Sequence, residues 1–231
     1  MQTQTDVEKS WNETFLKAKM AYPSEYVIRI LKGNYPDLNL NKNDFKGRKF
    51  LDLGCGEGRN LVVAHEVGFD ICGVEITDEI VELIKRNLSS FRIDNSNIRK
   101  GTNSRIPFND EDIDYLLSWN SAYYMESPEA DFQDHVKEFA RVLKKGGHLL
   151  MSVPKSTCFI YKDSLELRPG YRIIRNDPFK VRNGAVLRMF SSADELRASL
   201  GDFFYDFRFA DIHDNCFGFN YHWHIAVCRK K

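Results

Sequence analysis

The sequence predicts an α/β protein built on a mostly parallel sheet, with helices on both faces. Two observations support this prediction. Short apolar segments alternate with amphipathic segments of helical period between residues 49 and 154, which is typical of strands joined by helical crossovers. In addition, the first of these strands ends in a glycine-rich turn that opens a helix. At 231 residues the chain is long enough for one domain with a full core.

Composition and charge argue against several classes of protein. The 33 lysines and arginines balance 33 aspartates and glutamates, so the overall charge gives no reason to expect binding to nucleic acid or to a membrane surface. No apolar run approaches the roughly 20 residues of a membrane-spanning helix, and the first residues are too polar for a signal peptide. The five cysteines are scattered without a C-x-x-C pair, which indicates reduced thiols, a cytoplasmic protein and no zinc site.

The N-terminal part, residues 1–46, is expected to form a helical cap. Apolar residues recur here at helical spacing, Pro23 divides the stretch into two helices, and Ser24 can cap the second helix. Trp11 and Tyr22 are open to two interpretations. They pack in the core, or they form an aromatic lid over a ligand.

The alternation of strands and helices begins with a strand at residues 49–53. The glycine turn follows, then a helix at 61–67, and then a second strand at 71–74 that ends in Glu75. The next helix has a continuous apolar face over residues 80–88.

Further elements follow from capping and turn residues. Thr77 or Asp78 can cap the helix that starts there. A short third strand is expected at 97–100, and residues 101–108 read as a loop.

The alternation continues to residue 153. The fourth strand is expected at 112–118, and a helix begins at 127–129, where proline takes a favoured first-turn position. The glycine pair at 146–147 is expected to stop this helix, and the fifth strand follows at 148–153.

The C-terminal part departs from this rhythm. Residues 155–188 contain eight basic and three acidic side chains, a local charge of plus five, and form either a solvated face or part of a site. A helix with a capping-box pattern starts at 191–196. Two closing strands, 203–212 and 223–228, are joined by a hairpin at 215–218.

The residues at the ends of three predicted strands could together bind one ligand. In an open parallel sheet, ligands bind outside the carboxyl ends of the strands. Gly54, Gly56 and Gly58 lack a Cβ atom and let a ligand approach the backbone. Glu75 can accept hydrogen bonds from both hydroxyls of a ribose, and residues 102–104 can contact an adenine edge. Because no lysine follows the glycines, a P-loop is absent.

Four motifs together make the chain resemble the class I S-adenosylmethionine-dependent methyltransferases of the small-molecule type. They are Leu51-Asp52-Leu53-Gly54-Cys55-Gly56-Glu57-Gly58, Val74-Glu75, Ile106-Pro107-Phe108-Asn109-Asp110, and Phe139-Ala140-Arg141-Val142-Leu143-Lys144-Lys145-Gly146-Gly147. The resemblance implies a Rossmann-like, doubly wound sheet of seven strands, mostly parallel, with an antiparallel last strand. The expected organisation is one methyltransferase domain, 1–231, with a helical cap at 1–46, a cofactor-binding core at 47–154, a substrate-side insertion at 155–190 and a closing helix and strand hairpin at 191–231.

The resemblance implies S-adenosyl-L-methionine as the cofactor and no metal. Asp52 would interact with its ammonium group, Glu75 with its ribose, Ile76 with its adenine, and Asn120 would lie near the methyl sulfonium. One departure is Thr102, because related sequences usually carry an aspartate at that place. The expected cofactor-binding residues are Trp11, Asp52, Gly54, Cys55, Gly56, Asn60, Glu75, Ile76, Asn103, Ser104 and Asn120.

The methyl acceptor is expected to be a small polar or anionic molecule, such as a phosphorylated sugar or a nucleotide-linked metabolite, methylated on oxygen or nitrogen. Arginines of the basic segment could clamp a phosphate or a carboxylate. The expected substrate-side residues are Tyr22, Tyr124, Arg168, Arg172 and Arg175. Tyr123 and His222 are candidate catalytic residues, although packing or exposure to solvent is the preferred explanation for the histidines of the last strand.

Two alternatives stay open at this point. One is methylation of RNA or protein, although the Asn/Asp-Pro-Pro-Tyr/Phe motif of amino-methylating nucleic-acid enzymes is replaced by residues 119–122, so nucleic acid is not the expected partner. The other is a non-catalytic module that binds S-adenosylmethionine. No membrane association is expected, and a monomer or a homodimer fits the sequence.

Overall fold

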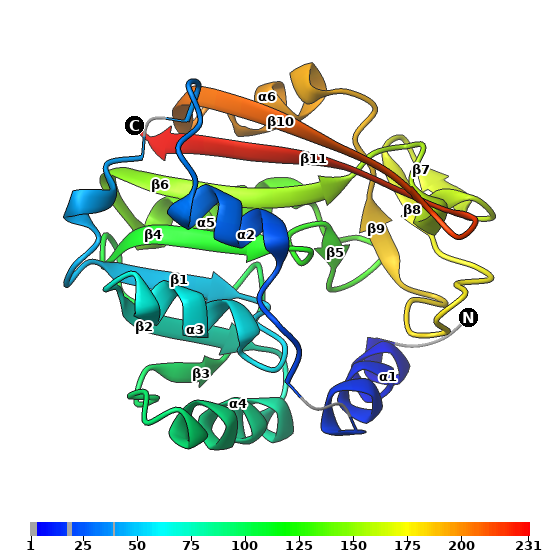
Figure 1. The fold of residues 1–231 in the computed structure, drawn as a ribbon. Helices are drawn as coiled ribbons and strands as arrows, with labels where there is room; N and C mark the ends of the chain where they lie inside the picture. Colours follow the sequence, from blue (N-terminus) through cyan, green and yellow to red (C-terminus); the bar gives the residue numbers. More distant parts are fainter. Residues whose placement is uncertain (1–3, 18–19, 39) are drawn as a thin grey trace.

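The computed structural model describes residues 4–17, 20–38 and 40–231, and its main feature is a seven-stranded sheet with helices around it (Figure 1). The strands of this sheet are β1 (Lys49–Leu53), β2 (Asp70–Glu75), β3 (Ile98–Lys100), β4 (Ile113–Trp119), β6 (Leu143–Pro154), β10 (Phe204–Cys216) and β11 (Phe219–Lys230). The helices are α1 (Gln4–Lys17), α2 (Glu25–Lys32), α3 (Arg59–Glu66), α4 (Asp78–Ser90), α5 (Phe132–Val142) and α6 (Ala193–Leu200), with short 3-10 turns η1 (Lys42–Asp44) and η2 (Phe159–Tyr161).

The strand order is β10-β11-β6-β4-β1-β2-β3. Neighbouring strands from β6 to β3 pair in parallel, and β11 is antiparallel to both β6 and β10. The predicted seven-stranded, mostly parallel sheet with an antiparallel last strand is therefore confirmed. The carboxyl ends of β1, β2 and β4 lie together at one edge of the sheet (Figure 1).

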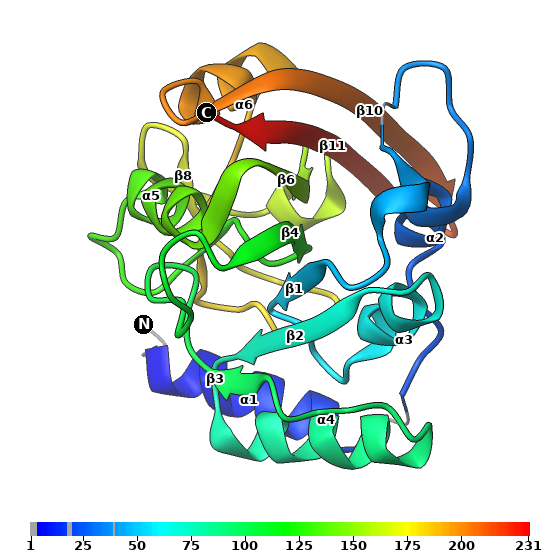
Figure 2. The same cartoon turned by 90° about the vertical axis from the view of Figure 1, so that its left-hand side faces the viewer.

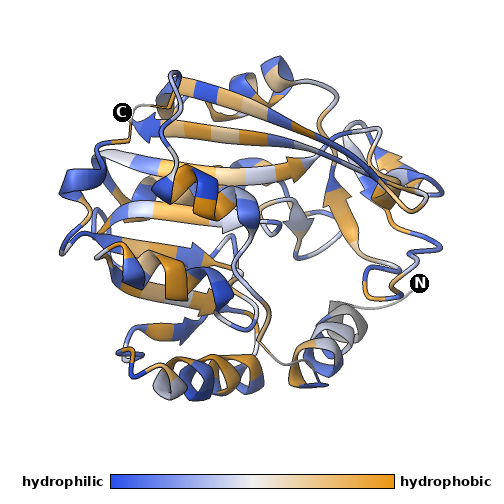
Figure 3. Cartoon of the chain, viewed as in Figure 1, coloured by the Kyte–Doolittle hydropathy of each residue, from blue (hydrophilic) through white to orange (hydrophobic). Residues whose placement is uncertain are grey.

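Helices cover both faces of the sheet. Figure 2 shows α2 and α3 on one face and α5 and α6 on the other, while α4 packs against β2 and β3. All seven residues of β4 are buried, as expected for a central strand covered on both sides, and Figure 3 shows hydrophobic residues concentrated along the central strands. Within the described ranges, every helix is too short or too polar to cross a membrane.

Two predicted helix caps are present. The Thr77 hydroxyl accepts a hydrogen bond from the backbone N–H of Ile80 at 3.3 Å and starts α4. The Ser192 hydroxyl accepts one from the N–H of Glu195 at 3.1 Å and starts α6. These contacts satisfy N–H groups that the first turn of a helix leaves without a partner.

Three local predictions are wrong. Ser24 precedes α2 but makes no side-chain cap; instead its backbone N–H donates to Asn60 Oδ1 at 3.0 Å. The helix expected from residues 127–129 starts later, because Asp131 provides the cap and 127–129 form a turn. Residues 146–147 do not stop that helix, since α5 ends at its own C-cap and the chain runs directly into β6, where the glycines accommodate an irregularity in strand register.

The basic segment forms part of a second, smaller sheet that the sequence did not predict. Its strands are β5 (Tyr124–Met125), β7 (Leu165–Arg168), β8 (Tyr171–Ile173) and β9 (Val186–Arg188), in the order β5-β9-β8-β7 and all antiparallel. Strands of two to four residues are too short to show a period of two in sequence. Since β5 follows β4 closely, this sheet joins the basic segment to the carboxyl edge of the main sheet (Figure 1).

Candidate functional site

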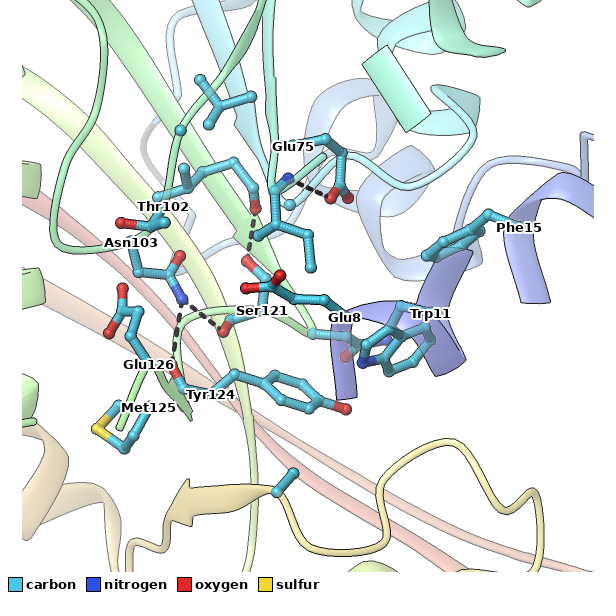
Figure 4. A pocket seen from close by; sticks show the side chains of 17 residues that line it. Glu8, Trp11, Phe15, Glu75, Thr102, Asn103, Ser121, Tyr124, Met125 and Glu126 are labelled. Carbon is cyan, nitrogen blue, oxygen red and sulfur yellow. Dashed lines mark hydrogen bonds between the residues drawn. The ribbon is translucent and has the colours of Figure 1, made fainter. Parts of the chain in front are cut away.

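A cavity of about 140 Å³ lies at the carboxyl ends of β1, β2 and β4 (Figure 4). Seven predicted site residues line it: Trp11, Gly54, Glu75, Ile76, Asn103, Asn120 and Tyr124. Thr102, which the sequence analysis placed in the adenine-contacting loop, also lines it, and nine other lining residues were not predicted: Glu8, Phe15, Leu53, Val74, Gly101, Ser121, Met125, Glu126 and Ala185. Helical spacing from Trp11 could have identified Glu8 and Phe15, which lie three residues before and four residues after it.

The glycine turn places backbone, rather than side chain, against the cavity. Gly54 and Gly56 both have positive φ angles, +73° and +57°. A Cβ atom at Gly54 would lie 2.5 Å from the Cβ of Ser121, so no larger residue fits there without displacement. The turn is held by the N–H of Gly54, which donates to the carbonyl of Val74 at 2.9 Å.

Asp52 precedes this turn and has a fully buried side chain. Neither carboxyl oxygen has a hydrogen-bond partner among the described residues. Burial, and then the charge of Glu75, raise the pKa of Asp52 to about 8. A buried, unpartnered carboxyl group is costly unless a donor or a cation meets it. Asp52 does not itself line the cavity, but its carboxyl group directly precedes the glycine turn that does, and this suits a ligand with a positively charged, hydrogen-bonding group such as ammonium.

Glu75 ends the neighbouring strand and faces the cavity. Its carboxylate accepts hydrogen bonds from the N–H of Gly56 at 2.7 Å and from the N–H of Ile76 at 2.9 Å. Burial raises the pKa of Glu75 to about 7, although these two hydrogen bonds act in the opposite direction. A carboxylate oxygen can accept more than one hydrogen bond, so Glu75 can also bind vicinal hydroxyls.

The loop after β3 forms another wall. The side-chain amide of Asn103 donates to the carbonyl of Ser121 at 3.0 Å, with the carbonyl of Tyr124 at 3.5 Å. The backbone N–H of Ser104 donates to Glu126 Oε1 at 3.0 Å, and Ser104 itself does not line the cavity.

An aromatic group from α1 covers the cavity (Figure 4). Trp11 stacks on Phe15 with ring centroids 5.4 Å apart and meets the ring of Tyr124 edge-on at 5.9 Å. The helix is anchored to the core because Thr77 Oγ1 donates to Asn12 Oδ1 at 2.6 Å. Trp11 both packs against the core and lines the cavity, so its part as a ligand lid stays a prediction.

Arg182 lies next to this aromatic group, and the sequence analysis did not single it out. Its Nε donates to the hydroxyl of Tyr124 at 3.0 Å, its Nη1 pairs with Asp177 at 3.2 Å, and its guanidinium carbon lies 5.7 Å from the Trp11 ring centroid. The same segment contains seven other lysines and arginines, and nothing in the sequence distinguishes Arg182 from them.

The remaining predicted cofactor residues lie behind the cavity wall. Cys55 is buried, and its thiol donates to the carbonyl of Val74 at 3.5 Å. Asn60 accepts a hydrogen bond from Ser24 and so ties the segment before α2 to α3. Both support the glycine turn and do not line the cavity.

The candidate catalytic residues also lie outside the lining. Tyr123 is buried between Tyr124 and Trp223, with centroid distances of 4.8 and 5.7 Å, and burial raises its pKa well above the ordinary value. His222 Nδ1 lies 2.9 Å from Thr157 Oγ1. Neither residue contributes to the cavity wall.

The predicted acceptor residues other than Tyr124 are not part of the cavity wall. Tyr22 is 92% exposed. Arg168 lies over the ring of Tyr171 at 3.5 Å, Arg172 donates to the carbonyl of Ser164 at 2.8 Å, and Arg175 is exposed.

Comparisons with known proteins agree with this geometry. A family model described as a methyltransferase domain matches residues 44–195, well over half of the chain. The arsenite methyltransferase of Halobacterium salinarum is 27% identical over 194 residues, covering 80% of this chain and 45% of the relative. The chain spans less than half the length of the curated relatives that it matches.

Solved structures share the fold. An S-adenosylmethionine-dependent methyltransferase from Methanosarcina mazei superposes with a TM-score of 0.64 at 19% identity, covering 85% of this chain and 98% of the other. Phosphoethanolamine N-methyltransferase 2 of Haemonchus contortus, in complex with S-adenosyl-L-methionine, superposes with a TM-score of 0.62 at 14% identity. This match covers 99% of this chain and 57% of the other.

The fold is that of the class I S-adenosylmethionine-dependent methyltransferases, such as the one from Methanosarcina mazei. The chain belongs to the methyltransferase-domain family. S-adenosyl-L-methionine is the cofactor of this class, and the residues present fit it. The unpartnered Asp52 suits its ammonium, Gly54 lines the cavity where its methionine part would lie, and Glu75 suits its ribose.

Proposed function

We propose that this protein transfers the methyl group of S-adenosyl-L-methionine to an oxygen or nitrogen atom of a small polar molecule. The observation that carries the proposal is the unpartnered, buried carboxyl group of Asp52 beside a glycine turn, with Glu75 at the next strand end. When bound, the cofactor supplies a methyl sulfonium, which is reactive toward nucleophiles.

The protein's part in the reaction is to bind, to orient and to exclude water. Glu75 and Asn103 would hold the nucleoside part, with Ser104 behind Asn103 and Ile76 against the adenine. Asn120, whose side chain is fixed by Ser152 at 2.9 Å, would lie near the transferred methyl group. Trp11 would close the site. Such positioning supplies most of the rate when the methyl donor is intrinsically reactive.

The acceptor is proposed to carry an oxygen-rich group, such as a carboxylate or a phosphate. Arg182 supports this, because its Nη2 has no hydrogen-bond partner among the described residues while its other nitrogens hold Tyr124 and Asp177. A guanidinium presents donors in a fixed plane that suits such oxygens. A clamp formed by Arg168 and Arg172 stays a prediction, and it would require both to leave their present contacts.

The first experiment incubates the protein with methyl-labelled S-adenosylmethionine and a metabolite extract. A newly labelled small molecule identifies the acceptor. Cofactor binding without any labelled product would instead support a non-catalytic module, and label in RNA or protein would support the alternative substrate classes.

Arginine variants then test the acceptor site. Arg182→Lys should raise the KM for the acceptor by tenfold or more, since a hydrogen bond to a charged group is worth about 1.5–3 kcal/mol. The same assay on alanine variants of Arg168, Arg172 and Arg175 tests the clamp, and unchanged kinetics in all three would rule it out. Tyr123→Phe and His222→Ala test the two candidate catalytic residues: a lower kcat with unchanged cofactor affinity would support a part in the reaction, and unchanged kinetics would exclude it.

A further inference from the structure

We propose that His135 is a buried imidazolium that, through Glu126, fixes the loop of residues 102–104 so that Asn103 selects adenine as the base of the cofactor. The inference rests on the proposed function, because it concerns the nucleoside end of the same cavity. It assigns His135 and Glu126 as positioning residues.

Both ring nitrogens of His135 face groups that accept hydrogen bonds. The side chain has no exposed surface. Nδ1 lies 3.0 Å from the carbonyl oxygen of Ala122, and Nε2 lies 2.6 Å from Glu126 Oε2. A carbonyl and an ionised carboxylate can only accept, so each ring nitrogen has to carry a proton. A neutral imidazole would leave one of these buried contacts without a hydrogen.

Glu126 transmits this constraint to the loop. Its second oxygen, Oε1, accepts a hydrogen bond from the backbone N–H of Ser104 at 3.0 Å. Burial acts to raise the pKa of Glu126, but the hydrogen bond and the charge of His135 lower it to about 2. Glu126 is therefore ionised at any pH at which the protein works, and it lines the cavity beside Asn103 (Figure 4).

The loop is attached at its base and near its tip. At its base, the N–H of Gly101 donates to the carbonyl of Glu75 at 2.9 Å. Near its tip, the backbone of Ser104 is held by Glu126, and the side chain of Asn103 is held by the carbonyl of Ser121. Loss of the Glu126 contact would remove the backbone attachment of the tip and leave Asn103 tethered only through its side chain, so the effect should be confined to the part of the ligand that the tip contacts.

The orientation of the Asn103 amide follows from its neighbours. Its nitrogen faces two carbonyl oxygens, those of Ser121 and Tyr124, and only the NH2 end can donate to them. Oδ1 is left without a hydrogen-bond partner among the described residues. As a hydrogen-bond acceptor on this wall, Oδ1 would bind the 6-amino group of adenine. It would disfavour the 6-oxo group of hypoxanthine, because two hydrogen-bond acceptors cannot bond to each other.

The test compares two ligands that differ at this position. The affinities of S-adenosylhomocysteine and S-inosylhomocysteine are measured by calorimetry for the wild type and for the variants His135→Phe and Glu126→Met. The wild type should prefer the adenosyl ligand, and this preference should fall about tenfold in both variants, the equivalent of one hydrogen bond. Glu126→Gln should keep most of it, because the amide oxygen can still accept from Ser104. Glu129→Met is the control and should match the wild type.

Three outcomes would overturn the inference. The first is an unchanged preference in His135→Phe and Glu126→Met. The second is a 15N NMR spectrum of the wild type at pH 7.5 in which one ring nitrogen of His135 is unprotonated, a measurement that does not depend on any variant folding. The third is a wild type that binds neither ligand, which would also refute the proposed function. Failure to find a methyl acceptor would affect only the proposed function, because these binding measurements do not depend on methyl transfer.

Discussion

The carboxylate of Glu75 accepts a hydrogen bond from the backbone N–H of Gly56 at 2.7 Å. This contact joins the end of β2 to the turn that follows β1. The two strand ends therefore form one continuous wall of the cavity. Glu75 holds that wall together and presents its remaining acceptor capacity to a ligand.

We expect Glu75→Gln to weaken binding of S-adenosylhomocysteine by roughly 10- to 100-fold, because hydrogen bonds to a charged acceptor are worth about 1.5–3 kcal/mol. Calorimetric titration measures the effect. Glu66→Gln is a suitable control, since Glu66 is exposed and pairs with Lys32 on the surface. An affinity within twofold of the wild type would contradict the role given to Glu75.

Gly54→Ala should abolish cofactor binding. A matched variant at Gly47 separates the effect of backbone strain from that of the collision with Ser121. Gly47 has nearly the same φ angle, +72° against +73°, but a Cβ atom there would meet nothing within 4 Å. Gly47→Ala should therefore cost only the backbone strain, about 1–2 kcal/mol of unfolding free energy. Gly54→Ala adds the collision with Ser121, and Ser121→Gly in the same chain should recover part of the loss. Equal unfolding free energies for the two alanine variants in urea would count against this account.

The titration of Asp52 should lower the stability of the ligand-free protein as the pH rises from about 4 to 8. The pKa of Asp52 is raised to about 8 from its ordinary value of 3.8, so the folded state keeps a proton that the unfolded chain releases in this window. Unfolding free energy then decreases by up to about 1.4 kcal/mol per pH unit for this proton.

Asp52→Asn should reduce this slope, because it removes the titrating group. The slope that remains has two contributions of opposite sign: the pKa of Glu75, raised to about 7, lowers stability as the pH rises, whereas the pKa of His148, lowered by burial to about 4, increases it below about pH 6.5. Urea unfolding at several pH values between 5 and 8 measures both slopes. Identical slopes in the variant and the wild type would refute the assignment.

Trp11→Ala should weaken cofactor binding several-fold, because the ring covers the cavity and contacts Phe15 and Tyr124. The cofactor should protect α1 from limited proteolysis in the wild type and protect it less in the variant. Leu16→Ala, on the exposed side of the same helix, is the control. No protection of the wild type would argue against closure by α1.

Local chemistry explains what could be predicted from the sequence. The glycine turn and Glu75 each belong to a short segment whose strand, turn and end residue are contiguous, so pattern alone located them. Arg182 acts on Tyr124 across 58 positions, and His135 acts on Glu126 from a different element. Such long-range side-chain contacts depend on how helices, strands and loops pack together, and the periodicity of the sequence does not predict them.

The same limit explains the second sheet. Its strands β7 and β8 alternate apolar and charged residues over only three or four positions, and β9 has two apolar residues followed by Arg188. The sheet is joined to the edge of the cavity through the pairing of β9 with β5. The long parallel strands were found because each one buries a continuous apolar run.

The placement of α1 has a practical consequence for handling the protein. Glu8 and Trp11 line the cavity, so any tag or fused domain attached at the N-terminus begins only a few residues from the mouth of the site. Lys230, at the end of β11, bonds to Glu111 and to the carbonyl of Leu143 at the opposite end of the sheet (Figure 1). Affinity handles, fluorophores and surface attachment therefore belong at the C-terminus.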